Sequence, residues 1–241
     1  MNVGKPFRRA AIFGASGGIG GALATRLAES GIEVWAGSRS GKAADPALRA
    51  FRFDLSDEAS IVAAAAAMAD APPDLVVVAS GVLTLADGSG PERSYKQIDG
   101  AAMDEVFRLN TIGPALVAKH MLPLLPRDRR SVFAALSARV GSIGDNRIGG
   151  WRSYRASKAA LNMLLKNFAI ELARTHKQAI VAGLHPGTVD SALSEPFQAN
   201  LPAGQLTRPA DAADNLLNVI DGLTVADSGG VFDWKGEAVP A

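Results

Sequence analysis

The sequence predicts an α/β fold: a single domain of Rossmann type, in which a parallel, doubly wound sheet of about seven strands carries helices on both faces. Short runs of apolar and β-branched residues alternate along the chain with longer segments of helical periodicity. This alternation is typical of parallel strands joined by crossover helices. The chain has 241 residues, which suits one large domain better than two small ones. We therefore assign residues 1–241 to one domain.

The expected strands are short apolar runs bounded by glycine, proline or polar residues. The run at 10–13 ends in glycines, and the run at 75–78 is continuous and β-branched, as in parallel strands that are buried on both faces. In chain order, the strands are expected at 10–13, 32–36, 51–53, 75–78, 131–136, 180–184 and 230–234.

The expected helices are marked by caps and by apolar stripes. Gly31 ends the first helix, and Ser56 or Asp57 caps the second, whose five consecutive alanines are strong helix formers. The helix that contains Tyr154 carries a leucine-rich stripe and ends near residue 174. The other helices are expected at 19–30, 61–69, 101–122 and 209–223.

Composition excludes several classes of function. The 25 basic and 24 acidic residues give a net charge of +1, so nothing points to nucleic acid or a membrane surface as a partner. The chain has no cysteine and only three histidines, which are far apart in the sequence, so we expect neither a disulfide nor a metal site. No apolar stretch is long enough for a signal peptide core or a membrane span, and we expect a cytoplasmic protein.

Glycines cluster where the first strand should meet the first helix. The segment reads Gly14-Ala15-Ser16-Gly17-Gly18-Ile19-Gly20. Glycine allows the sharp turn and close approach that a pyrophosphate requires, and the following helix presents free N–H groups to the anion. A surface turn has a similar composition, but the position after the first strand favours a dinucleotide site.

The end of the second expected strand bears on the choice between NAD and NADP. An acidic residue there accepts a hydrogen bond from the ribose of NAD, but this segment has none and offers Arg39 between Ser38 and Ser40. Arginine binds phosphate well, so we expect NADP rather than NAD; the alternative is an exposed loop arginine. Asp54, after the third strand, is placed either to bind adenine or to cap the next helix.

Tyr154 and Lys158 lie one helical turn apart, so the two side chains share a helix face. A free tyrosine has a pKa of about 10, and a neighbouring ammonium lowers it towards the range in which a phenol exchanges protons. The same spacing also occurs in helices whose lysine is simply solvated.

Together these residues resemble the short-chain dehydrogenase/reductase family over nearly the whole chain. The spacing of Gly14, Gly18 and Gly20 is similar to the family's G-x-x-x-G-x-G turn. Further matches are the Tyr154–Lys158 pair, Asn110 in the fourth helix of the family, and Pro186-Gly187-Thr188-Val189 near the nicotinamide. Segments similar to the C-factor-like branch of the family are Pro91-Glu92-Arg93-Ser94, Asn110-Thr111-Ile112-Gly113-Pro114 and Gly229-Gly230-Val231-Phe232-Asp233-Trp234.

Two departures from the family pattern affect the site. Val78-Ala79-Ser80-Gly81 stands where the family usually has Asn-Asn-Ala-Gly. Counting back from Gly141 places Ala138 at the family's catalytic serine, with Ser137 beside it. We assign the role to Ser137; the alternatives are Ser142 or no serine at all.

The resemblance implies an NADP(H)-dependent carbonyl reductase or alcohol dehydrogenase acting on a small carbonyl or alcohol. Ser137 and Tyr154 would bind the carbonyl oxygen, with Tyr154 as proton donor. Lys158 would tune Tyr154 and hold the nicotinamide ribose, and Asn110 would relay protons to Lys158. The residues expected to bind the cofactor are Gly14, Ser16, Gly17, Gly18, Ile19, Gly20, Arg39, Asp54, Leu55, Ala79, Ser80, Gly81, Tyr154, Lys158, Pro186, Gly187 and Val189.

The resemblance also implies a homodimer or homotetramer, paired through the helices that hold Asn110 and Tyr154, and a substrate loop at about 188–205. Trp151, Trp234 and Phe197 either line the substrate entrance or serve in packing. The alternative function is an NAD(P)-binding C-factor-like signalling or regulatory protein with little or no turnover.

Overall fold

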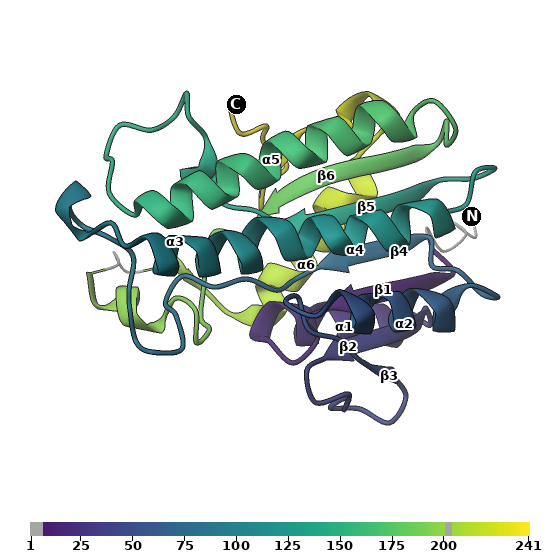
Figure 1. The fold of residues 1–241 in the computed structure, drawn as a ribbon. Coiled ribbons are helices and arrows are strands. Elements are labelled where there is room, and N and C mark those ends of the chain that lie inside the picture. The colour runs from purple at the N-terminus through teal and green to yellow at the C-terminus, as the bar shows by residue number, and fades with distance from the viewer. Residues whose placement is uncertain (1–6, 201–203) are drawn as a thin grey trace.

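The computed structural model describes residues 7–200 and 204–241, and its main strands form one seven-stranded parallel sheet (Figure 1). The strands are β1 (Arg9–Phe13), β2 (Glu33–Ser38), β3 (Arg49–Arg52), β4 (Leu75–Val78), β5 (Ser131–Leu136), β6 (Ala179–His185) and β9 (Val231–Asp233). Their order is β3-β2-β1-β4-β5-β6-β9. Because β1 lies between β2 and β4, the chain reverses its direction of travel across the sheet there, and the carboxyl ends of the strands at such a switch point are where open parallel sheets bind ligands.

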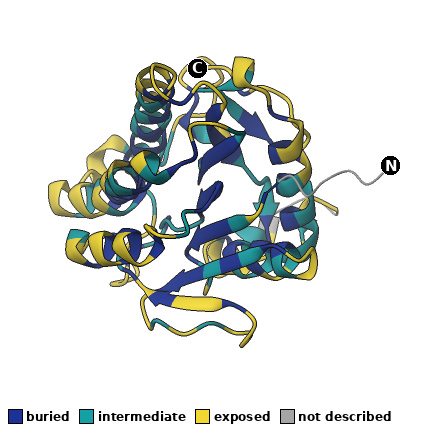
Figure 2. Cartoon of the chain, turned by 90° about the vertical axis from the view of Figure 1, so that its right-hand side faces the viewer, coloured by how far each residue is buried: buried dark blue, intermediate teal, exposed yellow. Residues whose placement is uncertain are grey.

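Two layers of helices cover the sheet. The helices α1 (Gly18–Glu29) and α6 (Pro209–Gly222) pack on one face. On the other face lie α2 (Glu58–Met68), α4 (Gly113–Met121) and α5 (Arg152–Leu172). Strand side chains alternate between these layers, as Ile12 and Phe13 do. Figure 2 shows the central strands of the sheet buried and the outer sides of the helices exposed. The edge strand β3 is largely exposed.

The predicted fold is confirmed, with small shifts at the ends of most elements. The strands at 75–78 and 131–136 have the predicted bounds. A two-residue pair outside the main sheet, β7 (Thr188–Val189) with β8 (Leu206–Thr207), was not predicted. Elements of two residues carry no periodicity by which a sequence reveals them.

The continuous helix predicted at 101–122 is wrong in its middle. The chain forms α3 (Gly100–Phe107), a π-helical turn at Arg108–Ile112 and then α4. In that turn the Gly113 N–H donates to the carbonyl of Arg108, five residues back. Pro114 explains the interruption, because it has no N–H to give to the carbonyl of Asn110 and its ring crowds that carbonyl in a regular helix.

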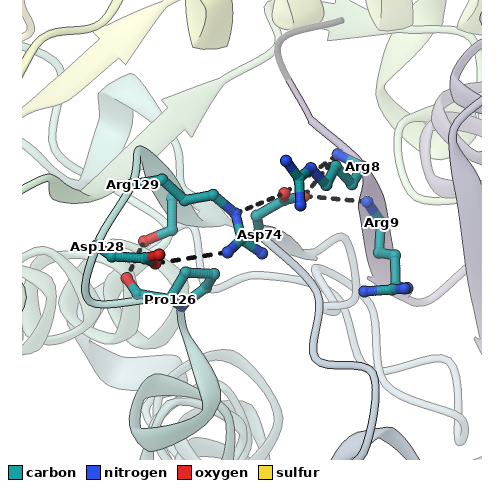
Figure 3. Close-up of polar contacts among 7 residues, drawn as sticks. Arg8, Arg9, Asp74, Pro126, Asp128 and Arg129 are labelled. Carbon is teal, nitrogen blue, oxygen red and sulfur yellow. Dashed lines mark hydrogen bonds and ion pairs between the residues drawn. The ribbon is translucent and has the colours of Figure 1, made fainter.

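Asp74 links the amino ends of β1 and β4 through hydrogen bonds (Figure 3). Its side chain is buried, and Oδ1 accepts the main-chain N–H groups of Arg8 and Arg9, each at 3.0 Å. The Arg129 Nε lies 3.6 Å from Oδ2. Burial of this carboxylate is tolerated because these N–H groups take the place of the water molecules that would hydrogen-bond to it in solution.

Asp74→Asn is expected to lower the free energy of unfolding by about 2 kcal/mol, because a neutral amide replaces a charged acceptor. Urea unfolding followed by circular dichroism measures this change. Asp128→Asn is the matched control: Asp128 lies in the same cluster, but its side chain is 81% exposed, and a surface change stays within about 0.5 kcal/mol. Equal losses in the two variants would contradict the role given to Asp74.

Within the ranges that the structure describes, no helix has the length and apolar character needed to cross a bilayer. The expected cytoplasmic location stays a prediction.

Candidate active site

The glycine turn lies at the carboxyl end of β1, at the switch point of the sheet. The N–H groups of Gly14 and Ala15 both donate to the Gly37 carbonyl, at 3.0 and 2.9 Å. Gly14 has a φ of +110°, and a side chain at Gly20 would collide with the Gly14 carbonyl, so both positions require glycine. The first N–H groups of α1 have no capping side chain from Gly17, and residues 16–18 are exposed. This turn fits an anion such as a pyrophosphate.

The segment after β4 packs against this turn. The Ala79 N–H and the Ser80 hydroxyl both donate to the Phe13 carbonyl, at 2.8 and 3.2 Å. A side chain at Gly81 would lie 2.9 Å from the Asn110 Oδ1. The departure from Asn-Asn-Ala-Gly therefore leaves the sheet edge hydrogen-bonded, with Ser80 supplying one of the donors.

Polar residues lie at the carboxyl ends of β2 and β3. Arg39 is exposed, whereas Ser38 is buried and its hydroxyl bonds to the Ser40 hydroxyl and the Lys42 carbonyl. Asp54 accepts the N–H and hydroxyl of Ser56, which lower the pKa of the carboxyl. The cap of α2 is Asp57.

The other residues expected at the cofactor lie close to the same edge of the sheet. Pro186 and Gly187 follow β6, and Ile19 lies in the first turn of α1 and packs against the core. Leu55 and Val189 are buried, and Leu55 lies where it excludes any side chain at Gly113. Apolar packing is thus enough to explain why Leu55 is buried, without contact to a ligand.

Tyr154 and Lys158 occupy the first two turns of α5, and both are buried. The Lys158 ammonium donates to the Leu136 carbonyl at 2.8 Å and lies 5.8 Å from the centre of the Tyr154 ring. Burial raises the pKa of Tyr154 to about 12 and lowers the pKa of Lys158 to about 8. Lys158 was expected to lower the pKa of Tyr154, but here desolvation of the phenol dominates.

Asn110 lies in the π-helical turn and is fully buried. Its amide accepts the Val82 N–H and donates to the Val82 carbonyl, each at 2.8 Å, and it also donates to the Ser157 hydroxyl at 3.3 Å. A side chain on Gly81 would lie close to both the Asn110 amide and, at 3.5 Å, the Lys158 ammonium. Asn110 and Lys158 therefore meet over Gly81.

The structure turns Ser137 away from the position expected for it. The Ser137 hydroxyl donates to Asn162 Oδ1 on α5 at 2.5 Å, while Ala138 packs with Tyr154 and Leu83. Neighbouring residues of an extended chain point to opposite sides, so only one of the two can face Tyr154. The Ser142 hydroxyl accepts the Asp145 N–H. The position beside Tyr154 thus carries a methyl group.

A cavity of about 560 Å³ is bordered by Trp151 and Phe197, and the Trp151 ring in turn contacts the ring of Tyr154. The Trp151 ring centre is 6.3 Å from that of Tyr154 and 5.2 Å from that of Phe197. Phe197 belongs to the expected substrate loop at 188–205, of which residues 201–203 lie outside the described residues. Trp234 packs against Gly187 instead. The cavity is lined by Gly90, Pro91, Glu92, Arg93, Gln97, Trp151, Pro196, Phe197 and Ala199.

Sequence reasoning missed two residues that shape this region. Glu92 was noted only as part of a segment similar to one branch of the family, and Asn162 was not noted at all. Glu92 contacts Ser153, 61 residues away, and Asn162 contacts Ser137, 25 residues away. No local pattern signals such contacts. In the part of the chain that the structure describes, no group of three or more His, Asp or Glu side chains is placed to hold a metal ion.

Comparisons with known proteins agree with this geometry. The family model for short chain dehydrogenase matches residues 8–202. The C-signal protein of Myxococcus xanthus is 35% identical over 169 residues, which cover 70% of this chain and 93% of that protein. The 1-hydroxy-2-glutathionyl-2-methyl-3-butene dehydrogenase of a Rhodococcus species is 30% identical over 228 residues, 90% of this chain and 92% of that protein.

The fold matches that of an NADPH-bound carbonyl reductase from chicken fatty liver, with a TM-score of 0.83 and 26% identity, over 97% of this chain and 94% of that one. The chain belongs to the short-chain dehydrogenase family. It is an NAD(P)-dependent oxidoreductase with a small-molecule substrate.

Proposed function

We propose that the protein is an NADP(H)-dependent carbonyl reductase or alcohol dehydrogenase that acts on a small carbonyl or alcohol. The observation that carries this proposal is the convergence of Tyr154, Lys158 and Asn110 beside the glycine turn. The similarity to a carbonyl reductase with bound NADPH and to a Rhodococcus dehydrogenase supports it.

The groups proposed to hold the cofactor lie around the carboxyl ends of β1 and β4. The glycine turn and the amino end of α1 would bind the pyrophosphate, Asp54 the adenine, and Lys158 the nicotinamide ribose. Arg39, exposed after β2 with no acid in its segment, would bind a 2′-phosphate and thus favour NADP over NAD. When bound, the cofactor supplies or accepts the hydride.

Tyr154 is the proposed proton donor in carbonyl reduction. Its high pKa keeps the phenol protonated at neutral pH, so a proton is present to be donated. Lys158, held by the Leu136 carbonyl, carries positive charge below its pKa of about 8 and would stabilise the phenolate that the donation leaves. Asn110, which meets Lys158 over Gly81, is proposed to support proton resupply. Each of these groups acts by position and charge.

A signalling or regulatory protein with little or no turnover is the second candidate. Two observations favour it: the 35% identity to the C-signal protein and the methyl group of Ala138 where a hydroxyl would aid the reaction. The two candidates differ in whether the bound cofactor is consumed.

The test is a spectrophotometric assay of NADPH and NADH oxidation with aldehydes, ketones and quinones. We expect turnover with NADPH and a KM for NADH at least about tenfold higher, since a charge-assisted phosphate contact contributes about 1.5–3 kcal/mol. Arg39→Asp is expected to remove this preference. Arg174→Asp, at an exposed site beyond the far end of α5, is the control and is expected to keep it. Tight NADPH binding without turnover on any substrate would favour the signalling candidate.

We further propose that copies of the chain pair through the layer of α3, α4 and α5 as a homodimer or homotetramer. Apolar surface is exposed at Met163 and Ile170 on α5, at 62 and 55%, and at Ile112 in the turn between α3 and α4, at 48%. A monomer mass by sedimentation equilibrium would contradict this proposal.

A further inference from the structure

Glu92 ties the loop at 84–94 to the start of the helix that carries Tyr154. Glu92 is buried, with 9% of the residue exposed. Its carboxylate accepts the hydroxyl of Ser153 through Oε1 and the Ser153 N–H through Oε2, at 3.1 Å for the latter. Its main-chain carbonyl accepts the Trp151 N–H at 2.7 Å. All three contacts fall on the residues immediately before Tyr154.

The N–H groups at the beginning of α5 need a hydrogen-bond acceptor from outside the helix. The residue at the cap position, Trp151, gives no side-chain hydrogen bond to the helix, and the first N–H groups of a helix have no partner within it. A carboxylate there satisfies an N–H group and interacts favourably with the helix dipole. Burial alone would raise the pKa of Glu92, but the hydrogen bonds from Ser153 hold that pKa below its usual value. The group is therefore a carboxylate at neutral pH.

Trp151 stands in an unfavourable backbone conformation. It is the only non-glycine residue of the described chain with a positive φ, 47°, and it follows Gly149 and Gly150, which also have positive φ. For a bulky residue this conformation costs about 1–3 kcal/mol and persists only where its surroundings hold it. The bond from the Trp151 N–H to the Glu92 carbonyl is one such constraint, and it places the indole edge-on against the Tyr154 ring.

We propose that Glu92 is a positioning residue for Tyr154 and that it couples the wall of the 560 Å³ cavity to the proton donor. Glu92 and Trp151 both line this cavity, and both fix the turn from which Tyr154 extends. A substrate group that occupies the cavity therefore contacts the residues that set the place of the phenol. The expected effect of Glu92 on kcat rests on the proposed function, whereas its effect on the position of Tyr154 does not.

The kinetic test compares Glu92→Ala and Glu92→Gln with Glu171→Ala, a control at an exposed acid on the same helix. Glu92→Ala is expected to lower kcat about tenfold, because small displacements of a reacting group are costly, while the Kd for NADPH stays unchanged. Glu92→Gln keeps a carbonyl acceptor for the Ser153 N–H and is expected to recover part of the loss. If Glu92→Ala lowers the melting temperature and leaves kcat unchanged, Glu92 is a structural cap only, and the proposal fails.

A second measurement does not depend on turnover. The chain has two tyrosines, and Tyr95 is 67% exposed, so Tyr95→Phe leaves Tyr154 as the single site for a ring-fluorinated tyrosine. Glu92→Ala is expected to shift and broaden the fluorine NMR resonance of Tyr154, and Glu171→Ala to leave it in place. An unchanged resonance in folded Glu92→Ala would overturn the proposal. A shifted resonance in a protein without turnover would contradict the proposed function alone.

Discussion

Tyr154→Phe is expected to lower kcat for carbonyl reduction by about 1,000-fold, the middle of the range for removal of a general acid. The phenyl ring keeps the packing with Ala138, Leu83 and Trp151 but has no proton to donate. The groups proposed to hold the cofactor, the glycine turn and Arg39, are unchanged in this variant. NADPH affinity is therefore expected to stay at the wild-type value.

Fluorescence titration with NADPH and steady-state kinetics separate the two effects. Tyr95→Phe is the control, because Tyr95 is exposed and outside the site, and it is expected to behave as wild type. Unchanged kcat in Tyr154→Phe would exclude Tyr154 as the proton donor. A loss of NADPH binding would instead indicate that the ring shapes the cofactor site.

Ala138→Ser is expected to raise kcat/KM for carbonyl reduction by about tenfold to 100-fold. Ala138 packs against Tyr154, so a hydroxyl at this position would lie where a carbonyl oxygen is proposed to approach the phenol. A hydrogen-bond donor aimed at developing negative charge contributes about 100-fold to 1,000-fold when its position is ideal. We expect a serine at position 138, where the surrounding residues pack against alanine, to supply part of this rate enhancement.

Ser137→Ala provides the matched comparison. Because the Ser137 hydroxyl is bonded to Asn162, its removal is expected to lower stability by about 1 kcal/mol and to leave kcat/KM near wild type. The opposite pattern, in which Ser137→Ala abolishes turnover and Ala138→Ser changes nothing, would return the substrate contact to Ser137.

Sequence alone was enough for the order and type of the main elements, and for the bounds of two strands. The strands β4 and β5 are buried on both faces, so their apolar runs end where the strands end, and the predicted bounds match. The π-helical turn escaped prediction because the apolar pattern of 101–122 continues through it. Pro114 was the local signal, since a proline inside a helix removes the bond to the carbonyl four residues earlier.

The sequence was enough to predict which segments form the site, but not which way every side chain in those segments points. Tyr154, Lys158 and Asn110 were identified by spacing and resemblance, and the structure brings them together. The choice between Ser137 and Ala138 depends on which side of the chain each faces as β5 ends, and a shift of one residue reverses it. The contact between Glu92 and Ser153 depends on the path of a loop, and the periodicity of the sequence does not predict that path.

The anchor of Lys158 has a consequence for how this site tolerates mutation. Its ammonium is held by the main-chain carbonyl of Leu136, and every residue type supplies that carbonyl. Substitutions at the end of β5 can therefore change the polarity next to Tyr154 without releasing the lysine. The cation is tied to the backbone, and the chemical character of the surrounding pocket is left free to vary.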